Sequence, residues 1–523
     1  MERRTFLGKA SAGFGACAGI RSLTRLDRVL AQSLPNSSSS SHNASGISDG
    51  SGKVYVLLWF DTEDFTLPQS DGSAKRIAEF LQQQGIRGTF KVVGEKARTL
   101  ERRGRSDVIK AIARHEIGYH SNFHSRHPTV AEYESSLDWE QGAKEFTRRE
   151  YGGFQDVSRI FGKTPTCYGQ PGSSWAPQAF PALKDWGVNV YLDTADIVSL
   201  NGKPFWYGGL LNIFKIAGED DLRPNGDWSN LDQARLNFKA LHDRLLTESQ
   251  GGLVSLYFHP CEFVHREFAD VVNFGGGAST PLDRLKLPPV RSQAEVERAF
   301  GYLEGLVTYM KSLPSVRFIT ASKALDVYPD TTRGRQFSAE EISEIIRAVR
   351  PEVSFQAHRD YDLTASEVFE LLNQFVESGL QNKLSTSCRL SGSLFGPTCP
   401  STSLPQNLEI PWWQFSATVS DVSGFLENYH QIPNVVWFGS VGVPPESYVV
   451  ALAKTALTML DKRKPPKSVM VEAARLAAAE YVSNDSPQLW SWPIFPPGFH
   501  SSHIVSLAKL QAWTLKPARI GFS

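Results

Sequence analysis

Short apolar runs alternate with helical patterns along residues 54–329, and this alternation restricts the fold more than any other feature of the chain. Such a pattern is typical of a parallel sheet whose crossovers are helices. The run at residues 54–60 is continuously apolar, so it indicates a strand that is buried on both faces. We therefore predict one barrel-like α/β domain. Its predicted strands are residues 54–60, 88–93, 116–120, 188–192, 211–216, 253–258 and 316–320. Its predicted helices are residues 73–84, 106–114, 129–146, 179–186, 232–247 and 293–313.

The length and charge of the chain limit its number of domains and its classes of partner. It has 523 residues, more than one domain normally holds, which suggests two or three domains. Lys+Arg and Asp+Glu both number 55, so the formal net charge at pH 7 is zero. This balance argues against a nucleic-acid partner, which favours a basic surface. No apolar stretch is long enough to span a membrane in the mature chain.

The first residues have the layout of a targeting segment. Positive charge at Arg3 and Arg4 precedes a small, apolar run over residues 10–20, as in a signal peptide. The paired arginines before Phe6-Leu7 resemble the twin-arginine export motif. We predict a signal peptide over residues 1–31, a Ser-rich linker over 32–53, and a bacterial protein exported to the periplasm or the extracellular space.

Residues 335–523 differ in character from the α/β region. Ser338–Glu341 and Thr364–Glu367 each resemble a capping box before an apolar-periodic helix, and a further helix is expected after Pro444. We predict a separate, mostly α-helical domain of unknown role, with attachment to a cell-wall polymer as one option. Its aromatic segment at residues 490–499 either packs locally or stacks on sugar rings. Whether Cys388 and Cys399 form a disulfide across their Ser/Gly/Pro-rich loop is left open.

Chemically capable side chains follow three of the predicted strands. Asp61, Glu63 and Asp64 follow the first, His120 and His124 the third, and His259 the strand at 253–258. The carboxyl ends of parallel strands lie on one face, so we expect these side chains to converge. Two histidines and one carboxylate make a metal site with open positions, as catalytic sites have. Zinc is favoured, while cobalt, nickel or iron would also fit.

The acidic metal ligand has two candidates. Along an extended strand, Asp61 and Glu63 point to the same side and Asp64 points away, which favours Glu63. A turn that starts at Thr62 would instead bring Asp64 to the metal. Both residues stay candidates at this point.

Five segments resemble the motifs of the NodB-like polysaccharide deacetylases, also called carbohydrate esterase family four. In motif order they are residues 58–64, 114–124, 168–175, 192–194 and 256–260. The second and fifth are the most specific. The resemblance spans about residues 54–325 and implies a NodB homology domain, a distorted (β/α)7-type barrel.

The resemblance also implies roles for single residues. Asp61 matches the catalytic base and His259 the catalytic histidine, while an acidic residue of the first motif joins His120 and His124 on a divalent metal. The third and fourth motifs imply substrate-binding roles for Pro171, Gly172, Trp175 and Asp193. One departure stands out: the third motif usually carries an arginine that orients the base, and Gly169 stands at that position.

Three functions compete on the sequence alone. The first is an exported, metal-dependent deacetylase that removes acetyl groups from a glycan such as peptidoglycan, an exopolysaccharide or a chitin-like polymer. The second is hydrolysis of a small linear or cyclic amide, as in the allantoinase-like members of the superfamily. The third is a non-catalytic glycan-binding protein with a degenerate site, which the missing arginine suggests.

Overall fold

The computed structural model describes residues 52–214, 216, 222–224, 226–248, 251–380, 387–392, 394–401 and 403–521. The predicted signal peptide and almost all of the predicted linker lie outside these residues, so both stay predictions. Residue 215 of the predicted strand 211–216 lies outside them as well. Residues from Gly52 onward form one compact unit.

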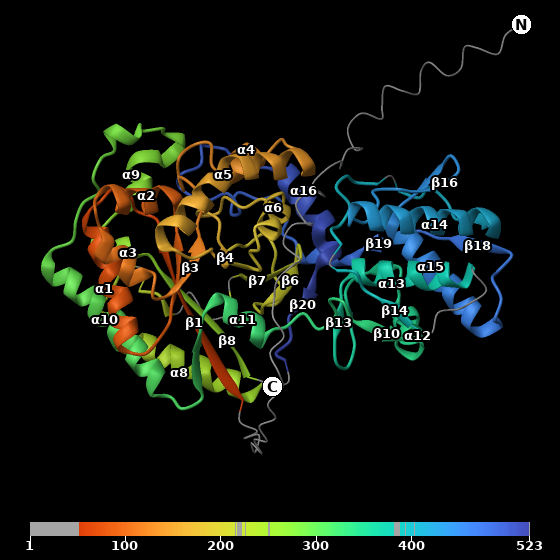
Figure 1. Cartoon of the computed structure of the whole chain (residues 1–523), viewed down its shortest axis with the longest axis horizontal. Coiled ribbons are helices and arrows are strands. Elements are labelled where there is room, and N and C mark those ends of the chain that lie inside the picture. Colours follow the sequence, from red (N-terminus) through yellow and green to blue (C-terminus); the bar gives the residue numbers. More distant parts are fainter. Residues whose placement is uncertain are drawn as a thin grey trace, which may run out of the picture. The chain divides into compact units, whose positions relative to one another are not determined.

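Ten of the described strands form one sheet (Figure 1). Its order is β20-β6-β7-β5-β4-β3-β2-β1-β8, and β9 also pairs with β1. All pairs from β7 through β8 are parallel, whereas β6 and β20 add antiparallel at one edge. The strands are β1 (Lys53–Thr62), β2 (Thr89–Val92), β3 (Glu116–Tyr119), β4 (Cys167–Tyr168), β5 (Val190–Asp193), β6 (Phe205–Tyr207), β7 (Leu210–Phe214), β8 (Gly251–Phe258), β9 (Val316–Ile319) and β20 (Lys516–Pro517).

Helices connect and cover these strands, so the predicted α/β class is confirmed. They are α1 (Gln69–Gln83), α2 (Gly94–Arg102), α3 (Ser106–Ile112), α4 (Val130–Glu134), α5 (Trp139–Phe161), α6 (Ala179–Asp185), α8 (Leu231–Thr247), α9 (Ala269–Phe274), α10 (Gln293–Ser312) and α11 (Ala321–Val327). The single helix predicted over residues 129–146 is wrong, because the chain forms α4 and α5 there. Asp138 starts the second helix by accepting a hydrogen bond from the Gln141 amide.

Strand β1 lies in the middle of the sheet and explains why the first apolar run is continuous. Val56, Leu58 and Phe60 pack into one core cluster, and Leu57 and Trp59 pack into another on the opposite face. All five side chains are buried. A strand with a core on each face has no place for alternating polar residues until it ends, and its end is where Asp61 and Glu63 stand.

The region after residue 335 is mostly helical, as predicted. Its helices are α12 (Ala339–Ala348), α13 (Ala365–Leu380), α14 (Trp412–Tyr429), α15 (Pro445–Lys462) and α16 (Ser502–Gln511). Both predicted capping boxes form, at the starts of α12 and α13. Among the described residues its short strands are β10 (Gln336–Ser338), β11 (Glu352–Val353), β12 (Gln356–Ala357), β13 (Asp362–Leu363), β14 (Ser387–Arg389), β15 (Leu408–Pro411), β16 (Val436–Phe438), β17 (Val441–Val443), β18 (Ser468–Val471) and β19 (Arg475–Leu476).

The last residues of the chain return to the first region. Figure 1 shows the blue β20 beside the yellow β6, and β20 pairs with β6 antiparallel. The Tyr207 hydroxyl donates to the Ala508 carbonyl at 2.8 Å. Lys516 is buried and forms ion pairs with Asp330 at 2.8 Å and Glu367 at 2.9 Å. These contacts join both regions, and the domain division predicted between residues 329 and 335 stays a prediction.

Two smaller expectations concern cysteines and membranes. The described cysteines, Cys388 and Cys399 among them, form no disulfide. Among the described residues, no helix is long and apolar enough to cross a membrane.

A buried acid in α4 leads to a stability prediction. Burial raises the pKa of Glu134 to about 8, and within the described part of the chain neither carboxyl oxygen has a hydrogen-bond partner. The folded state therefore holds a proton that the unfolded state releases near pH 4.5, and stability falls as the pH rises from about 5 to 8. We expect Glu134→Gln to raise the free energy of unfolding at pH 8 by about 2–4 kcal/mol, with little change at pH 4.5. Denaturant unfolding at both pH values measures this.

The control is Glu427→Gln, which replaces an exposed glutamate of α14. It should change stability little at either pH. Equal stabilities of Glu134→Gln and the unchanged protein at pH 8 would contradict the assignment of a buried, protonated Glu134.

Candidate metal and catalytic centre

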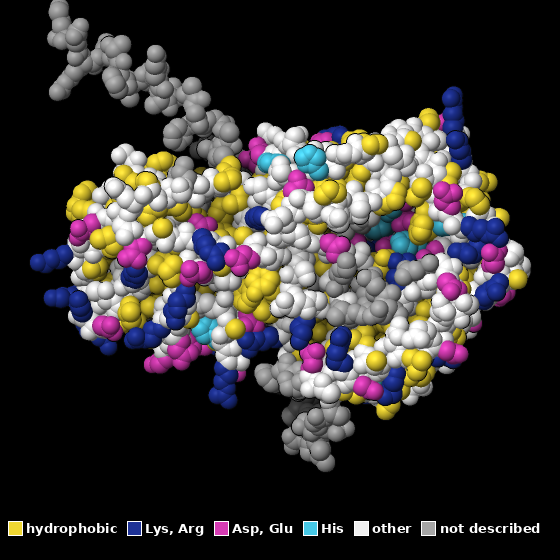
Figure 2. Space-filling model, turned by 180° about the vertical axis from the view of Figure 1, so that it is seen from behind, with side chains coloured by type: hydrophobic (Ala, Val, Ile, Leu, Met, Phe, Trp, Pro, Cys, Tyr) yellow, Lys and Arg dark blue, Asp and Glu magenta, His cyan; other side chains and the backbone are white. Residues whose placement is uncertain are grey.

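The predicted site residues from three strand ends meet at the carboxyl edge of the sheet. Asp61 lies near the end of β1, His120 directly follows β3, and His259 directly follows β8. His120 continues the ladder with a hydrogen bond from its amide to the Val92 carbonyl. On the face drawn in Figure 2, histidine and acidic side chains lie together in a hollow of the surface.

Glu63, His120 and His124 bring three ligand atoms within 4.8 Å of one another. The Oε2 atom of Glu63 lies 3.1 Å from Nε2 of His124 and 3.6 Å from Nε2 of His120. The two Nε2 atoms are 3.2 Å apart. All three side chains are buried. Buried imidazole nitrogens and a carboxylate oxygen that converge on one point form a candidate site for a metal cation.

The outer contacts of the two histidines suit metal binding. Nδ1 of His120 lies 3.0 Å from the Gly169 carbonyl oxygen, and Nδ1 of His124 lies 2.8 Å from a carboxylate oxygen of Asp270. An acceptor at Nδ1 holds the ring proton there and leaves the Nε2 lone pair for a metal. The donor set therefore fits a divalent metal with open positions, and zinc, cobalt, nickel and iron are all compatible with it.

The surroundings of His124 favour positive charge. Burial alone would lower the pKa of His124, but the Asp270 and Glu63 carboxylates hold it well above the ordinary value. The backbone of His124 has a φ of 54° and that of Ser121 a φ of 64°, which is uncommon for residues other than glycine. A metal would supply in the loaded protein the positive charge that these carboxylates attract.

Asp64 turns away from this group. Its Oδ1 accepts hydrogen bonds from the amides of Thr66 at 2.8 Å and Leu67 at 3.1 Å, so it caps the turn after β1. Asp61 and Glu63 both face the histidines, as the alternation along a strand predicts. Of the two acidic candidates, the geometry places Glu63 with the histidines.

Replacing each acid by its amide tests this arrangement. Glu63→Gln should lower the affinity for zinc by at least about tenfold, because an anionic ligand is lost. Asp64→Asn, the matched control, should bind zinc with the stoichiometry and affinity of the unchanged protein. Titration calorimetry with zinc measures both. The reverse order of effects would assign the ligand to Asp64.

Lys91 on β2 takes the place beside Asp61 where the resemblance led us to expect an arginine. Its register partner on β1 is Asp61. The Lys91 Nζ lies 3.0 Å from Asp61 Oδ1 and 2.8 Å from Asp193 Oδ2, and it donates to the Leu192 carbonyl at 2.9 Å. The ammonium is fully buried. Asp193, predicted to bind substrate, is thus the second anchor of this lysine.

Gly169 makes room for that ammonium. A Cβ atom at this position would lie 2.1 Å from Lys91 Nζ and 2.3 Å from Asp193 Oδ2. A side chain at residue 169 and the lysine therefore exclude each other. Burial opposes ionisation of Asp61, but His120, Lys91 and His259 outweigh it and hold the pKa of Asp61 below its ordinary value. A carboxylate of this kind can accept a proton.

His259 lies on the other side of Asp61 and Glu63. Its Nε2 is 3.8 Å from an oxygen of each carboxylate. Burial lowers the pKa of His259, but Glu63, Glu262 and Asp61 raise it above the ordinary value overall. The Phe268 ring packs edge-on at 5.0 Å and fixes the imidazole. The arrangement places a proton donor and a proton acceptor beside the metal ligands.

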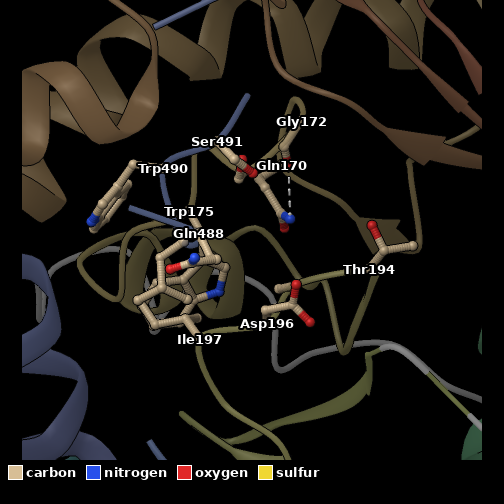
Figure 3. A pocket seen from close by; sticks show the side chains of 12 residues that line it. Gln170, Gly172, Trp175, Thr194, Asp196, Ile197, Gln488, Trp490 and Ser491 are labelled. Carbon is tan, nitrogen blue, oxygen red and sulfur yellow. Dashed lines mark hydrogen bonds between the residues drawn. The ribbon is translucent and has the colours of Figure 1, made fainter. Parts of the chain in front are cut away.

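The remaining predicted substrate-binding residues lie in the loop after β4. Trp175 is buried at 2 % exposure, and its ring packs against Phe180. Gly172 has a φ of 49° and lines a cavity together with Trp175, whereas Pro171 is buried in the loop between β4 and Gly172 (Figure 3). These positions border the site, and their contact with a substrate stays a prediction.

Three residues of the site were missed from the sequence. Lys91 is a charged residue inside an otherwise apolar run, so its position opposite Asp61 was a usable signal. Asp270 on α9 gave no such signal, and Trp492, although part of the aromatic segment at residues 490–499, was not linked to the site. Both reach the site only through the tertiary fold, where the Trp492 ring packs edge-to-face against His124 at 5.7 Å.

Three solved structures to which the chain is similar are a CE4 domain, a CE4 family pseudoenzyme and a glucanotransferase. A CE4 domain of a multidomain xylanase from the hindgut metagenome of Trinervitermes trinervoides is 11% identical and covers 53% of this chain and 90% of its own, with a TM-score of 0.29. A CE4 family pseudoenzyme from Bacillus anthracis is 13% identical over 53% of this chain and 66% of its own (TM-score 0.29). A 4-alpha-glucanotransferase from Thermococcus litoralis is 12% identical over 52% and 40% (TM-score 0.37).

Sequence comparison is more specific. No curated protein matches the chain. Residues 49–191 match the family model of the polysaccharide deacetylases. The match contains Asp61, Glu63, His120 and His124, while His259 lies beyond it. This chain therefore carries a polysaccharide deacetylase domain.

Proposed function

We propose that the protein is an exported, metal-dependent deacetylase that hydrolyses acetyl groups on a polysaccharide. One observation carries the proposal: Asp61 and His259 flank the buried group formed by Glu63, His120 and His124. The match of residues 49–191 to the polysaccharide deacetylases supports the substrate class. Export rests on the sequence pattern of residues 1–31 alone.

The side chains divide the reaction between them. A divalent metal on Glu63, His120 and His124 would lower the pKa of a water and polarise the acetyl carbonyl. Asp61 accepts the proton of the attacking water as general base. His259 then gives a proton to the departing amine or alcohol. The raised pKa of His259 and the lowered pKa of Asp61 agree with these roles.

Lys91 favours the enzyme over a non-catalytic glycan-binding protein. The missing arginine at residue 169 suggested a degenerate site, but a buried cation contacts Asp61 from the neighbouring strand. The base therefore keeps a positively charged partner at 3.0 Å. The function that the missing arginine would have served is available from a different position of the chain.

The test is acetate release by the purified protein from a panel of acetylated glycans, with and without a chelator. The panel contains N-acetylated chito-oligosaccharides, O-acetylated xylo-oligosaccharides and peptidoglycan, with allantoin as the small-amide comparison. We expect acetate from at least one glycan, loss with the chelator and recovery with zinc. Activity that survives the chelator would remove the metal from the proposal. Hydrolysis of allantoin alone would favour the small-amide function, and no hydrolysis at all would leave glycan binding.

A further inference from the structure

The segment Asp485–Phe499, near the end of the chain, forms part of the catalytic surroundings. The Trp492 ring meets the His124 ring at 89° with centroids 5.7 Å apart. A Cβ atom at Gly172 would lie 2.3 Å from two atoms of the Trp492 indole, so the glycine backbone rests directly on that ring. Trp492 thus lies between a metal-ligand candidate and the loop after β4.

Several contacts hold this segment in place. The amides of Gly276 and Gly277 donate to the carbonyls of Pro493 and Ile494, both at 2.9 Å. The Trp490 Nε1 donates to Asp485 at 2.7 Å, and Phe495 packs edge-to-face on Trp492 at 5.6 Å. The bonds from Gly276 and Gly277 anchor the segment directly after Trp492, and the other two contacts order it internally. Binding to an ordered wall costs little conformational entropy.

A cavity of about 160 Å³ lies beside this wall (Figure 3). Gln170, Thr194 and Asp196 line it from the loops after β4 and β5, and Gln488, Trp490 and Ser491 line it from the segment. Thr194 directly follows Asp193, whose carboxylate shares Lys91 with Asp61. The cavity therefore borders, at Thr194, the residue that shares Lys91 with Asp61.

Gln170 indicates the chemistry of a ligand. Its side chain is 1 % exposed and its Nε2 donates to the Gly172 carbonyl at 3.1 Å, whereas its Oε1 has no partner among the described residues. A buried acceptor without a donor costs free energy that a ligand hydroxyl or amide N–H would recover. Aromatic walls around a few polar groups are typical of small-molecule sites. A sugar matches these walls, because it carries hydroxyl donors on a compact, partly apolar ring.

We propose that residues 488–491, together with the loops after β4 and β5, form a subsite for a sugar ring adjacent to the one that is deacetylated. The inference rests on the proposed function only for the identity of the neighbouring ring. Binding of a sugar at the subsite does not itself require catalysis. The volume of the cavity is below the ~300 Å³ at which drug-sized pockets begin, so the cavity suits a single sugar ring. The C-terminal region would then select polymers over acetylated monosaccharides.

Calorimetric binding of N-acetylated chitotetraose and O-acetylated xylotetraose tests the subsite without using catalysis. Gln170→Leu, Gln488→Ala and Trp490→Ala should each raise the Kd of the tetrasaccharide that binds, by about tenfold for Gln170 and Trp490. Gln488 is exposed, so its variant tests binding with little risk to folding. Trp437→Ala, which removes a 51 % exposed tryptophan of β16, is the matched control and should bind like the unchanged protein.

The outcomes separate this inference from the proposed function. Tetrasaccharide binding that depends on Gln170 and Trp490, without acetate release, would uphold the subsite and overturn the deacetylase. Acetate release with a Kd unaffected by all three variants would overturn the subsite and uphold the deacetylase. Equal losses in Trp437→Ala, or no binding of either tetrasaccharide to the unchanged protein, would overturn the subsite.

Discussion

The Lys91→Met variant is expected to lower kcat/KM for acetate release by about 10²- to 10³-fold, within the range of a general base. Methionine has a side chain of similar length but lacks the buried ammonium that separates Asp61 from Asp193. Two buried carboxylates would then face each other without a cation, so one would take up a proton. The pKa of Asp61 should rise, and the acidic limb of the pH profile of kcat/KM should move to higher pH.

A charge-retaining variant distinguishes the role of the charge from damage to the fold. Lys91→Arg keeps a buried cation beside Asp61 and Asp193. It should therefore be more active than Lys91→Met, with an acidic limb nearer to that of the unchanged protein. An unshifted pH profile in Lys91→Met would show that the lysine does not act on the base.

The His120→Ala variant is expected to lose tightly bound zinc and at least about 10³-fold in kcat/KM, equivalent to the several kcal/mol that a metal supplies. His120 contributes one of the two imidazole ligands, and its loss leaves Glu63 and His124 alone. Metal analysis of the purified variant and acetate release measure the two effects. Full zinc occupancy with wild-type activity would exclude His120 from the site.

His430→Asn is the control for that variant. His430 is exposed and ends α14 with a φ of 49°, a conformation that asparagine also adopts readily. The substitution removes a histidine of the C-terminal region without disturbing its helix cap. Zinc content and activity should match those of the unchanged protein.

The strand ends were predictable because their geometry follows from the backbone alone. A continuous apolar run that ends in Asp61 and Glu63 can only be a buried strand whose last side chains leave the core. Parallel pairing then brings His120 and His259 to the same edge without further information. Alternation favoured Glu63 but left Asp64 as a candidate, and the turn that Asp64 caps was visible only in the structure.

The missed contacts share a different cause. Lys91 reaches Asp193 across 102 positions and Trp492 reaches His124 across many more, and neither pair has a local pattern. Strands β4 and β20 contain two residues each, too few for a periodic signal. Pairings of this kind depend on the packing of the whole chain, which propensities and spacing do not contain.

The position of β20 has a consequence for the order in which the protein can be completed. During synthesis, residues 52–329 leave the ribosome long before Lys516 and Pro517, yet those residues extend the main sheet beside β6. Until then, the edge of β6 stays open, Tyr207 lacks its Ala508 acceptor and the Trp492 wall is absent. The region around the candidate site therefore reaches its final form only after residue 517 has left the ribosome. Nascent chains released early would carry an exposed strand edge and an incomplete site.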